Sequence, residues 1–319
     1  MSTTTGIKSV THTSMEEAAS LLRAGQLVAF PTETVYGIGA DARNDLAVAR
    51  IFEVKNRPQF NPLIVHIKDL KQANSYAVFG DISTQAAEKF WPGPLTLVLP
   101  RRPHSNISRL ASAGLNTVAL RAPGHPTARQ LLKLASCPVA APSANLSGNL
   151  SPTTPHHVSK SLGDNVQLIL DGGPCSIGIE STIIDCSVTP PCLLRPGGVP
   201  VEEIEKEIGP LAVPSESTVR APGMLANHYA PATPVRLNAQ ECQTNEGLLA
   251  FGPNPVSGAK ITKNLSPTGD LVEAAANLFA MLHALDTENC TTIATMPVPG
   301  YGLGLAINDR LRRAAFEEK

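Results

Sequence analysis

Two cations lie two residues apart in the first third of the chain, at Lys55 and Arg57, directly before Pro58. The residue before a proline is disfavoured in the α region, so the helix expected ahead of this pair ends here and the chain becomes extended. Side chains two apart in an extended segment point the same way. Lysine offers a point charge and arginine a planar fork for phosphate oxygens. Helix carboxyl ends also attract cations that bind no ligand, so the pair alone does not establish a site.

Hydroxyl, carboxylate and phenol groups follow Pro31, where an apolar strand over Leu27–Phe30 is expected to end. The segment from Thr32 to Tyr36 therefore leaves a buried strand with four polar groups, and such strand ends commonly carry function. An ordinary turn with a helix cap is the alternative. Asn61 and His66 follow the cation pair, although a single histidine on a strand is more often a structural residue.

Residues 140–154 leave a second apolar strand and hold many hydroxyl and amide side chains, including Ser143, Asn145 and Ser151, but no carboxylate. Donors without a neighbouring negative charge suit the close approach of an oxyanion. A Ser/Asn-rich surface loop is the alternative. Further on, glycines at 172, 173, 178 and 197 permit close ligand contact, and Arg195 leaves a strand end beside them.

Several nucleotide and hydrolase motifs are absent from the sequence, which has no P-loop, no H-E-x-x-H, no G-x-S-x-G and no kinase set. Its six cysteines form no C-x-x-C pair, so structural zinc is not expected and reduced thiols are. A nucleotide would therefore have to bind by another architecture.

The net charge of −1 hides an uneven distribution. From Arg50 to Lys133 there are 12 Lys and Arg against 4 Asp and Glu, whereas the rest of the chain has 14 against 23. The basic segment is a candidate anion site, and a solvated basic face is equally consistent with it. With only 4% aromatic residues, the chain favours a small anionic ligand over a nucleic acid.

The patterns that position these groups alternate between strand and helix, which predicts an α/β fold with a mixed sheet. A capping box at Ser14 opens a helix that stops at Gly25. Further helices are expected over 45–54, 84–90, 126–134 and 155–162. Strands are expected over 27–30, 63–67, 95–99, 118–120, 139–141, 166–170, 182–185 and 193–194.

A proline-rich composition after Gly209 predicts a larger α/β domain over 1–209, a linker over 210–234 and a small Rossmann-like α/β domain over 235–319. In the last we expect strands over 235–237, 248–251, 260–265 and 292–296, with helices over 271–285 and from Ile307. No G-x-G-x-x-G follows a strand there, which disfavours a dinucleotide. No window approaches the roughly 18 apolar residues of a membrane span, and no secretory signal is present, so a cytoplasmic protein is expected.

Taken in order, these segments resemble the YrdC-like L-threonylcarbamoyl-AMP synthases in their longer, two-domain form. The segments that carry the resemblance are 30–37 (F-P-T-E-T-V-Y-G), 55–58 (K-x-R-P), 91–96 (W-P-G-P-L-T), 118–123 (V-A-L-R-x-P), 142–148 (P-S-A-N-x-S-G), 180–182 (E-S-T), 194–197 (L-R-P-G), 221–224 (A-P-G-M) and 228–231 (H-Y-A-P). The linker motif usually begins with serine where this chain has Ala221. The resemblance implies a YrdC-like twisted mixed sheet followed by a smaller α/β domain.

The activity implied is condensation of L-threonine, bicarbonate or CO2, and ATP to threonylcarbamoyl-AMP and pyrophosphate, for the threonylcarbamoyl modification of tRNA. Mg2+ is expected to accompany ATP, held through the phosphates and few protein ligands. Downstream tRNA threonylcarbamoyl-transferase proteins would accept the product. The linker is expected to fold over the site as a lid that excludes water.

The family's functional residues carry over to matching positions here. Lys55, Arg57, Ser143 and Asn145 are expected around the phosphates and the reacting carbamate. The other nucleotide-site positions are Asn61, Thr117, Ser151, Arg195 and Tyr229. The threonine pocket is expected to comprise Thr34, His66, Arg121, Ala141 and Ser181, with Arg121 binding the amino-acid carboxylate.

Two other functions stay open at this point. The first is an RNA-binding module, which the basic segment suits and the low aromatic content does not. The second is carbamoyl transfer in hydrogenase maturation, whose proteins carry zinc-binding cysteine pairs that this chain lacks.

Overall fold

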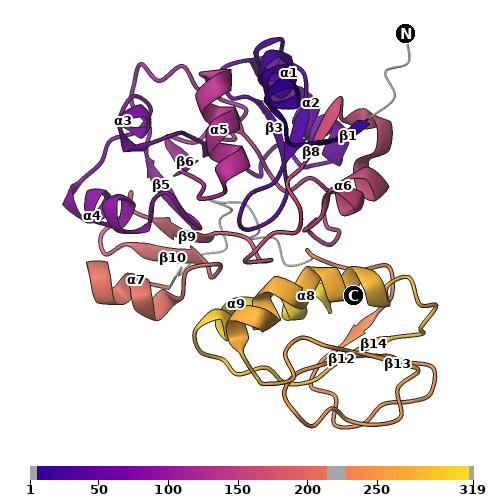
Figure 1. The fold of residues 1–319 in the computed structure, drawn as a ribbon. Helices are drawn as coiled ribbons and strands as arrows, with labels where there is room; N and C mark the ends of the chain where they lie inside the picture. The colour runs from indigo at the N-terminus through magenta and orange to yellow at the C-terminus, as the bar shows by residue number, and fades with distance from the viewer. Residues whose placement is uncertain (1–5, 214–227, 316–319) are drawn as a thin grey trace.

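The computed structural model describes residues 6–213 and 228–315, and the linker motif at 221–224 lies outside them. Figure 1 shows a larger and a smaller α/β unit in succession, which confirms the predicted fold class. In chain order the larger unit contains β1 Gly6–Ser9, α1 His12–Arg23, β2 Val28–Phe30, β3 Gly37–Asp41, α2 Asp45–Lys55, β4 Ile64–His66, α3 Leu70–Ala73, α4 Asp81–Phe90, β5 Leu95–Pro100, β6 Thr117–Arg121, α5 Pro126–Ala135, β7 Val139–Ala140, α6 Pro155–Leu162, the 3-10 turn η1 Gly163–Asn165, β8 Leu168–Asp171, β9 Thr182–Asp185, β10 Cys192–Arg195 and α7 Val201–Ile208. The smaller unit contains β11 Val235–Arg236, β12 Gly247–Ala250, β13 Ile261–Asn264, α8 Leu271–Leu285, β14 Ile293–Thr295 and α9 Leu303–Ala314.

The larger unit is built on one mixed sheet in the strand order β1-β8-β2-β3-β7-β4-β6-β5-β9-β10. Strands β4 and β6 run parallel, and their register places His66 opposite Arg121. Strand β5 pairs antiparallel with β6 and parallel with β9. Side chains alternate between the two faces of a strand, so this register puts His66 and Arg121 on one face of the sheet.

Helices cover the two faces of this sheet unequally. On one face α2, α4, α6 and α7 pack on alternate strand residues such as Val65 and Leu120. On the other face α1 and α5 cover β2, β7 and β8. The remaining strands present Ile64, Ala119 and Ile183 in a separate cluster that contains no residue of α1 or α5. The half-sheet that carries His66 and Arg121 is therefore left open for a cavity.

The first helix begins earlier than predicted. Thr11, not Ser14, is the N-cap of α1, and the capping box joins these two residues. The Ser14 hydroxyl accepts a hydrogen bond from the Thr11 backbone N at 2.9 Å, while Glu17 forms an ion pair with Lys8 of β1. The S-x-x-E spacing was misleading because Thr11 supplies an equivalent hydroxyl three residues earlier.

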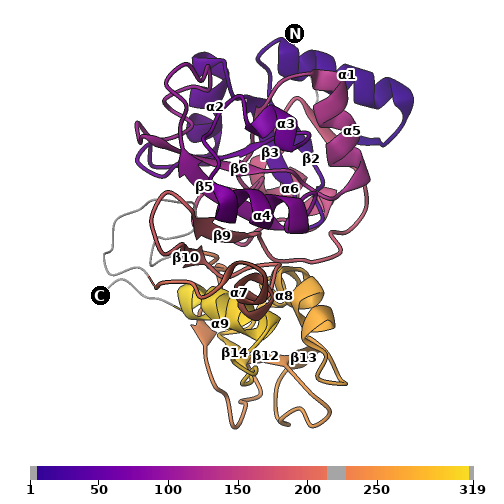
Figure 2. The ribbon, with the colours of Figure 1, turned by 90° about the vertical axis from the view of Figure 1, so that its left-hand side faces the viewer.

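The sequence analysis did not predict four helices and strands of the larger unit, namely β1, β3, α3 and α7. Strand β3 was not predicted because glycine, of which it has two, is uncommon in strands. Packing against neighbouring side chains nevertheless requires glycine there. A Cβ at Gly39 would lie 2.7 Å from Val139 Cγ1 and 2.8 Å from Phe30 Cε1. Helix α7 was hidden among prolines and packs against α4 (Figure 2).

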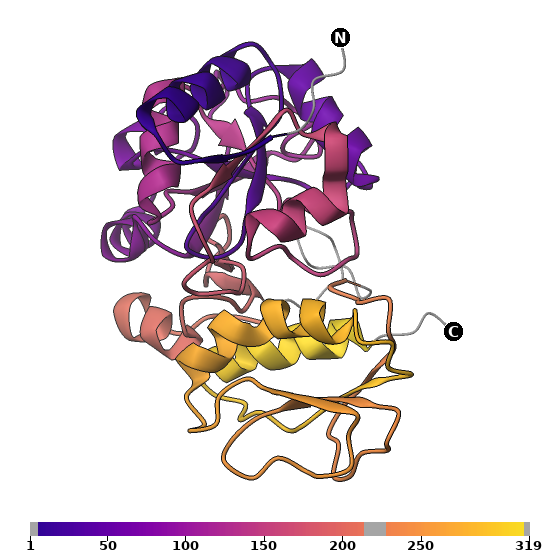
Figure 3. The same ribbon diagram turned by 45° about the vertical axis from the view of Figure 1, so that its right-hand side comes forward.

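The smaller unit has a parallel sheet in the order β11-β14-β12-β13, and β13, α8 and β14 form the predicted βαβ unit. Its last helix, α9, begins at Leu303 rather than Ile307. Figures 1 and 3 show α8 and α9 facing the larger unit, with the small sheet on their far side. One apolar cluster joins Val35, Leu150 and Ile179 of the larger unit to Leu278 and Phe279 of α8, so the two units share a core.

Within residues 6–213 and 228–315, no helix combines the length and the apolar character that crossing a bilayer requires.

Candidate functional site

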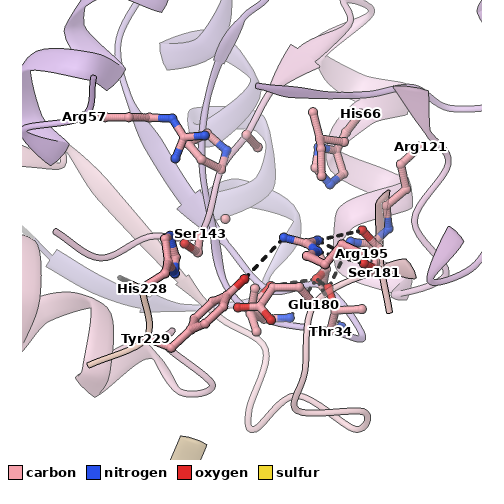
Figure 4. Close-up of a pocket in the computed structure, with 16 residues that line it drawn as sticks. Thr34, Arg57, His66, Arg121, Ser143, Glu180, Ser181, Arg195, His228 and Tyr229 are labelled. Atoms are coloured by element: carbon pink, nitrogen blue, oxygen red, sulfur yellow. Dashed lines mark hydrogen bonds between the residues drawn. The ribbon is translucent and has the colours of Figure 1, made fainter. Parts of the chain in front are cut away.

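A cavity opens at the uncovered half of the large sheet and is closed on one side by His228 and Tyr229 (Figure 4). Nine of the residues predicted from the sequence line it, drawn from eight separate segments of the chain. They are Thr34, Arg57, His66, Arg121, Ala141, Ser143, Ser181, Arg195 and Tyr229. The tertiary structure thus brings the predicted cations and hydroxyls into one site.

Arg57 is a buried cation with no carboxylate partner among the described residues. It is 7% exposed, and its Nε and Nη2 donate to the carbonyl oxygens of Asn61 at 3.2 Å and Pro62 at 2.9 Å. Burial and the neighbouring Arg195 lower its pKa to about 10, although Tyr229 opposes them. A buried guanidinium that faces a cavity without a counter-ion is a place for an anion.

Arg195 ties two strand ends of the site together. It extends from β10, and its Nη2 donates to the Ser181 carbonyl oxygen at 2.9 Å. Its Nη1 lies 3.5 Å from the Tyr229 hydroxyl oxygen. Gly197 allows this turn to pass close to the neighbouring strand, since a Cβ there would lie 2.4 Å from backbone atoms of Glu180, Ser181 and Thr182.

Arg121 lies opposite Arg57 across the cavity and is held by a carboxylate (Figure 4). Its Nη2 donates to Glu33 Oε1 at 2.6 Å, its Nη1 to Thr34 Oγ1 at 2.9 Å, and its Nε to the Gly93 carbonyl oxygen at 3.2 Å. Burial alone would raise the pKa of Glu33, but Arg121 lowers it to about 2. Three of the five guanidinium protons are used, which leaves two for a ligand.

His66 is a neutral imidazole in this site. Burial and the Arg121 charge lower its pKa to about 3, and its Nδ1 has no hydrogen-bond partner among the described residues. Its ring makes an edge contact with Phe30, with 6.2 Å between the ring centroids. A neutral ring can accept or donate a hydrogen bond to a ligand without adding a fourth positive charge to those of Arg57, Arg121 and Arg195.

Lys55 and Asn145 lie behind the cavity wall. The Lys55 ammonium is 1% exposed and donates to the carbonyl oxygens of Ser143, at 2.6 Å, and of Asn145. Burial, and to a lesser degree Arg57, lower the pKa of Lys55 well below its usual value. Asn145 Nδ2 donates to the carbonyl oxygens of Leu146 and Asn149. In this structure both residues therefore shape the loop that carries Ser143.

Three other predicted residues lie outside the cavity lining. Both amide atoms of the fully buried Asn61 lack hydrogen-bond partners among the described residues, which a bound ligand or water would have to supply. Ser151 donates to the Glu180 carboxylate. Thr117 lies at the opposite end of β6 from Arg121, about 13 Å along the strand. The positions assigned to all fourteen residues stay predictions.

The sequence analysis missed Glu180 and His228 as site residues. Glu180 lines the cavity and is 6% exposed, while His228 packs edge-on against Tyr229 with ring centroids 4.0 Å apart. A signal for His228 was its place directly before the predicted Tyr229. Glu180 had a similar signal, since it directly precedes the predicted Ser181 in the E-S-T segment, but its contacts with Ser151 and the distant Arg310 are not apparent from the sequence.

The described residues hold no group of three or more His, Cys, Asp or Glu side chains that could bind a metal ion. The two Glu180 oxygens already accept from Ser151 and Arg310. A divalent cation therefore fits this site only with ligands of its own, such as phosphates. The six cysteines are free thiols.

The fold and the cavity define a class: a mixed-sheet α/β protein whose buried arginines and hydroxyls converge on one cavity, followed by a second α/β domain. Comparison with known proteins narrows this class. A Sua5/YciO/YrdC family model, described as telomere recombination, matches residues 20–197. A second model, described as the C-terminal domain of threonylcarbamoyl-AMP synthase, matches residues 199–316.

Curated relatives agree with these matches. A threonylcarbamoyl-AMP synthase of Pyrococcus abyssi is 43% identical over 93% of this chain and 93% of its own length. That of Bacillus subtilis is 41% identical over 94% of this chain and 92% of its own. The crystal structure of P. abyssi Sua5 complexed with L-threonine superposes with a TM-score of 0.90 at 40% identity, over 98% of both chains. The chain belongs to the threonylcarbamoyl-AMP synthase family and has both of its domains.

Proposed function

We propose that this protein is an L-threonylcarbamoyladenylate synthase, a nucleotidyltransferase that condenses L-threonine, bicarbonate and ATP to threonylcarbamoyl-AMP and pyrophosphate. The observation that carries the proposal is the buried Arg57, which has no carboxylate partner among the described residues and shares a cavity with Arg121 and Arg195. Two ends of one cavity suit two anionic substrates, a polyphosphate and an amino-acid carboxylate.

The reaction balances in two steps. The threonine amine bonds to the carbon of bicarbonate or CO2 and gives a carbamate, with loss of water in the first case and of a proton in the second. A carbamate oxygen then attacks the α-phosphorus of ATP, and the bond from that phosphorus to the bridging oxygen breaks as pyrophosphate leaves. Little covalent chemistry is asked of the protein, so positioning and charge neutralisation provide the rate.

The threonine end of the site is assigned to Arg121 and its neighbours. The two unused protons of Arg121 bind the substrate carboxylate, and Glu33 fixes the plane of the fork. Thr34, Ser181 and the neutral His66 offer hydrogen bonds to the amine and hydroxyl of threonine. Ala141 leaves room beside them. Threonine as a substrate is supported by the L-threonine complex of P. abyssi Sua5.

The nucleotide end is assigned to Arg57, Arg195, Ser143 and Tyr229. Lys55 and Asn145 hold the loop of Ser143, from which backbone and hydroxyl donors reach the phosphates. The apolar face formed by Ile64, Ala119 and Leu194 continues from this end of the cavity and suits the base. Thr117 lies on the same face, far enough along β6 to reach the nucleoside when the phosphates lie near Arg57.

Mg2+ enters with ATP under this proposal and is held by the phosphates, because the described residues that line the cavity include no acidic cluster. The ion would neutralise phosphate charge alongside the arginines. The product then passes to proteins that transfer the threonylcarbamoyl group to tRNA, and the reaction takes place in the cytoplasm.

The test is turnover by the purified protein. ATP should be converted to pyrophosphate only when both threonine and bicarbonate are present, and mass spectrometry should find threonylcarbamoyl-AMP. Tight, salt-sensitive RNA binding without such turnover would replace the proposal with the RNA-binding alternative. Transfer of a carbamoyl group from carbamoyl phosphate would favour the other alternative, carbamoyl transfer in hydrogenase maturation. The described residues hold no cysteine cluster of the kind that binds zinc in those proteins.

A further inference from the structure

Arg310 of α9 is a charged side chain of the smaller domain that reaches the cavity wall, where Phe279 of α8 also packs near Tyr229. Arg310 is 0% exposed, and arginine is rarely buried so completely unless it is paired. Its Nε donates to Glu180 Oε2 at 2.9 Å, and its Nη1 donates to the Pro196 carbonyl oxygen at 2.6 Å. Both acceptors belong to the larger domain, so this guanidinium crosses the domain boundary.

Of the residues that Arg310 contacts, Glu180 and Tyr229 line the cavity, whereas Pro196 and Arg310 itself do not. The Arg310 Cζ lies 5.3 Å from the centroid of the Tyr229 ring, a cation–π distance. The second Glu180 oxygen, Oε1, accepts from Ser151. Arg310 is thus linked to Tyr229 directly and to Ser151 through Glu180, and both belong to the predicted nucleotide site.

Domain docking does not depend on this ion pair alone. The apolar cluster that includes Phe279 already joins the two domains. Gly178 packs so closely on α8 that an added Cβ would lie 2.5 Å from the carbonyl oxygens of Ala275 and Ala276. The Gly302 backbone N also donates to Glu202 at 3.0 Å. A buried ion pair is weak evidence for stability, so Arg310 needs another explanation.

The charge of Arg310 keeps Glu180 ionised. The titratable groups around Glu180 are Arg310 and Asp309 of α9, Arg195 of β10 and Tyr229. Burial alone would raise the pKa of Glu180, but Arg310 and then Arg195 lower it below its usual value. Without Arg310 the buried carboxylate would take up a proton more readily.

We propose that Arg310 is a positioning residue of the nucleotide half of the site, through which the C-terminal domain holds Glu180 and Tyr229 in place. This inference rests on the proposed synthase function and assigns to the C-terminal domain a part in ATP binding. The larger domain's cavity is incomplete without it, because the guanidinium that orders two of its walls comes from α9.

The test compares Arg310→Met with Arg312→Met in the full-length protein. Arg312 lies on the same helix, is exposed, and donates only within α9, to the Asn308 carbonyl oxygen. Arg310→Met should raise the KM for ATP at least about tenfold and leave the KM for threonine within about twofold. Arg312→Met should match wild type in both. Equal KM values for ATP in the two variants would overturn the proposal.

A pH profile separates positioning from general loss of structure. In Arg310→Met the acid limb of kcat/KM should move to higher pH by about one unit, since Glu180 is then protonated more easily. Arg310→Lys keeps a charge beside Glu180 and should keep the wild-type limb. Arg310→Met combined with Glu180→Gln should abolish the shift. Activity lowered equally at every pH, or a Lys variant with the shifted limb, would contradict the proposal.

Failure of the synthase proposal can be told apart from failure of the Arg310 proposal. In the first case the wild-type protein would make no threonylcarbamoyl-AMP. Calorimetric titration of ATP alone still tests Arg310 in that case, because the dissociation constant should rise about tenfold in Arg310→Met and stay unchanged in Arg312→Met.

Discussion

At the scale of single residues, the site works by placing unequal electrostatic environments at its two ends. Arg57 has no carboxylate partner among the described residues, whereas Arg121 is paired with Glu33 at 2.6 Å. The first arginine can offer its full charge to a polyphosphate. The second is partly neutralised and oriented, which suits a single carboxylate. Substitution of Arg57 is therefore expected to weaken mainly ATP binding, and substitution of Arg121 mainly threonine binding.

Arg57→Ala or Lys55→Ala should lower threonylcarbamoyl-AMP synthesis at least about tenfold, equivalent to about 1.4 kcal/mol of transition-state stabilisation. Under the proposed function, the Arg57 variant loses a direct contact with the phosphates, and the Lys55 variant loses the ammonium that holds the carbonyl oxygens of Ser143 and Asn145. The measurement is steady-state pyrophosphate release. Lys71→Ala, an exposed cation on α3, is the control. Unchanged turnover in both site variants would show that the phosphates bind elsewhere.

Arg121→Lys should raise the KM for threonine about tenfold and change the KM for ATP by less than about threefold, because an ammonium cannot hold Glu33, Thr34 and a carboxylate in one plane. Kinetics with each substrate varied in turn would measure both constants. Arg57→Lys is the matched comparison and should raise mainly the KM for ATP. The same pattern in both variants would mean that the two ends of the cavity have been assigned wrongly.

At the scale of elements, the strand ends carry the chemistry and the neighbouring turns carry the close contacts. Gly178 shows this most clearly, since it has a positive φ of +76° and lies against the backbone of α8. A side chain at this position would clash with the backbone of α8, so only glycine fits there. The turn between the β8 and β9 strand ends therefore fixes how near α8 can approach the cavity.

Gly178→Ala should destabilise the protein by about 1–3 kcal/mol more than Gly173→Ala does. Both glycines have a positive φ, +76° and +78°, but a Cβ at Gly173 would have no neighbour within 4 Å. The difference between the variants therefore isolates the clash with α8 from backbone strain. Urea unfolding monitored by circular dichroism gives both values. Equal decreases in the free energy of unfolding of the two variants would show that α8 can move away from Gly178 without loss of stability.

At the scale of the whole molecule, the two domains behave as one unit with the site at their junction. Beside the shared apolar cluster, His157 of α6 stacks on His283 of α8 with ring centroids 4.0 Å apart. His283 Nε2 also lies 3.2 Å from the Ser151 carbonyl oxygen. Burial, followed by His283 and Lys160, lowers the pKa of His157 to about 4, and burial lowers that of His283. Protonation of this pair therefore opposes domain docking.

Because the folded-state pKa of His157 lies below its unfolded value, its contribution to stability is present above about pH 6.5 and is lost as the pH falls towards 4. His157→Phe keeps a ring at the interface but cannot take up a proton. Its melting temperature should fall less than that of wild type between pH 7 and pH 5, by about 2 °C. Differential scanning fluorimetry would measure this. His104 is exposed, so His104→Phe is the control and should keep the wild-type pH dependence. If the melting temperature of all three proteins fell equally between pH 7 and pH 5, the pair His157 and His283 would be excluded as the cause of the pH dependence.

The sequence by itself determined the chemical content of the site and most of the elements around it. Apolar runs such as 95–99 and 118–120 marked strands because burial leaves few alternatives for such segments. Residue types after strands marked Ser143 and Arg195, and those after a helix marked Arg57, as anion-binding groups before any neighbour was known. These inferences depend on local spacing, which a single chain displays directly.

Only the tertiary structure decided which of these groups meet and what charge each retains. The strand order, with β4 between β7 and β6, puts His66 beside Arg121, and no local pattern specifies that order. The glycine-rich β3 became a strand because its neighbours need the space that side chains would occupy. Arg310 meets Glu180 across 130 residues of chain. Such contacts form only when the whole core packs, since their energies depend on burial and exact partners rather than on neighbours in sequence.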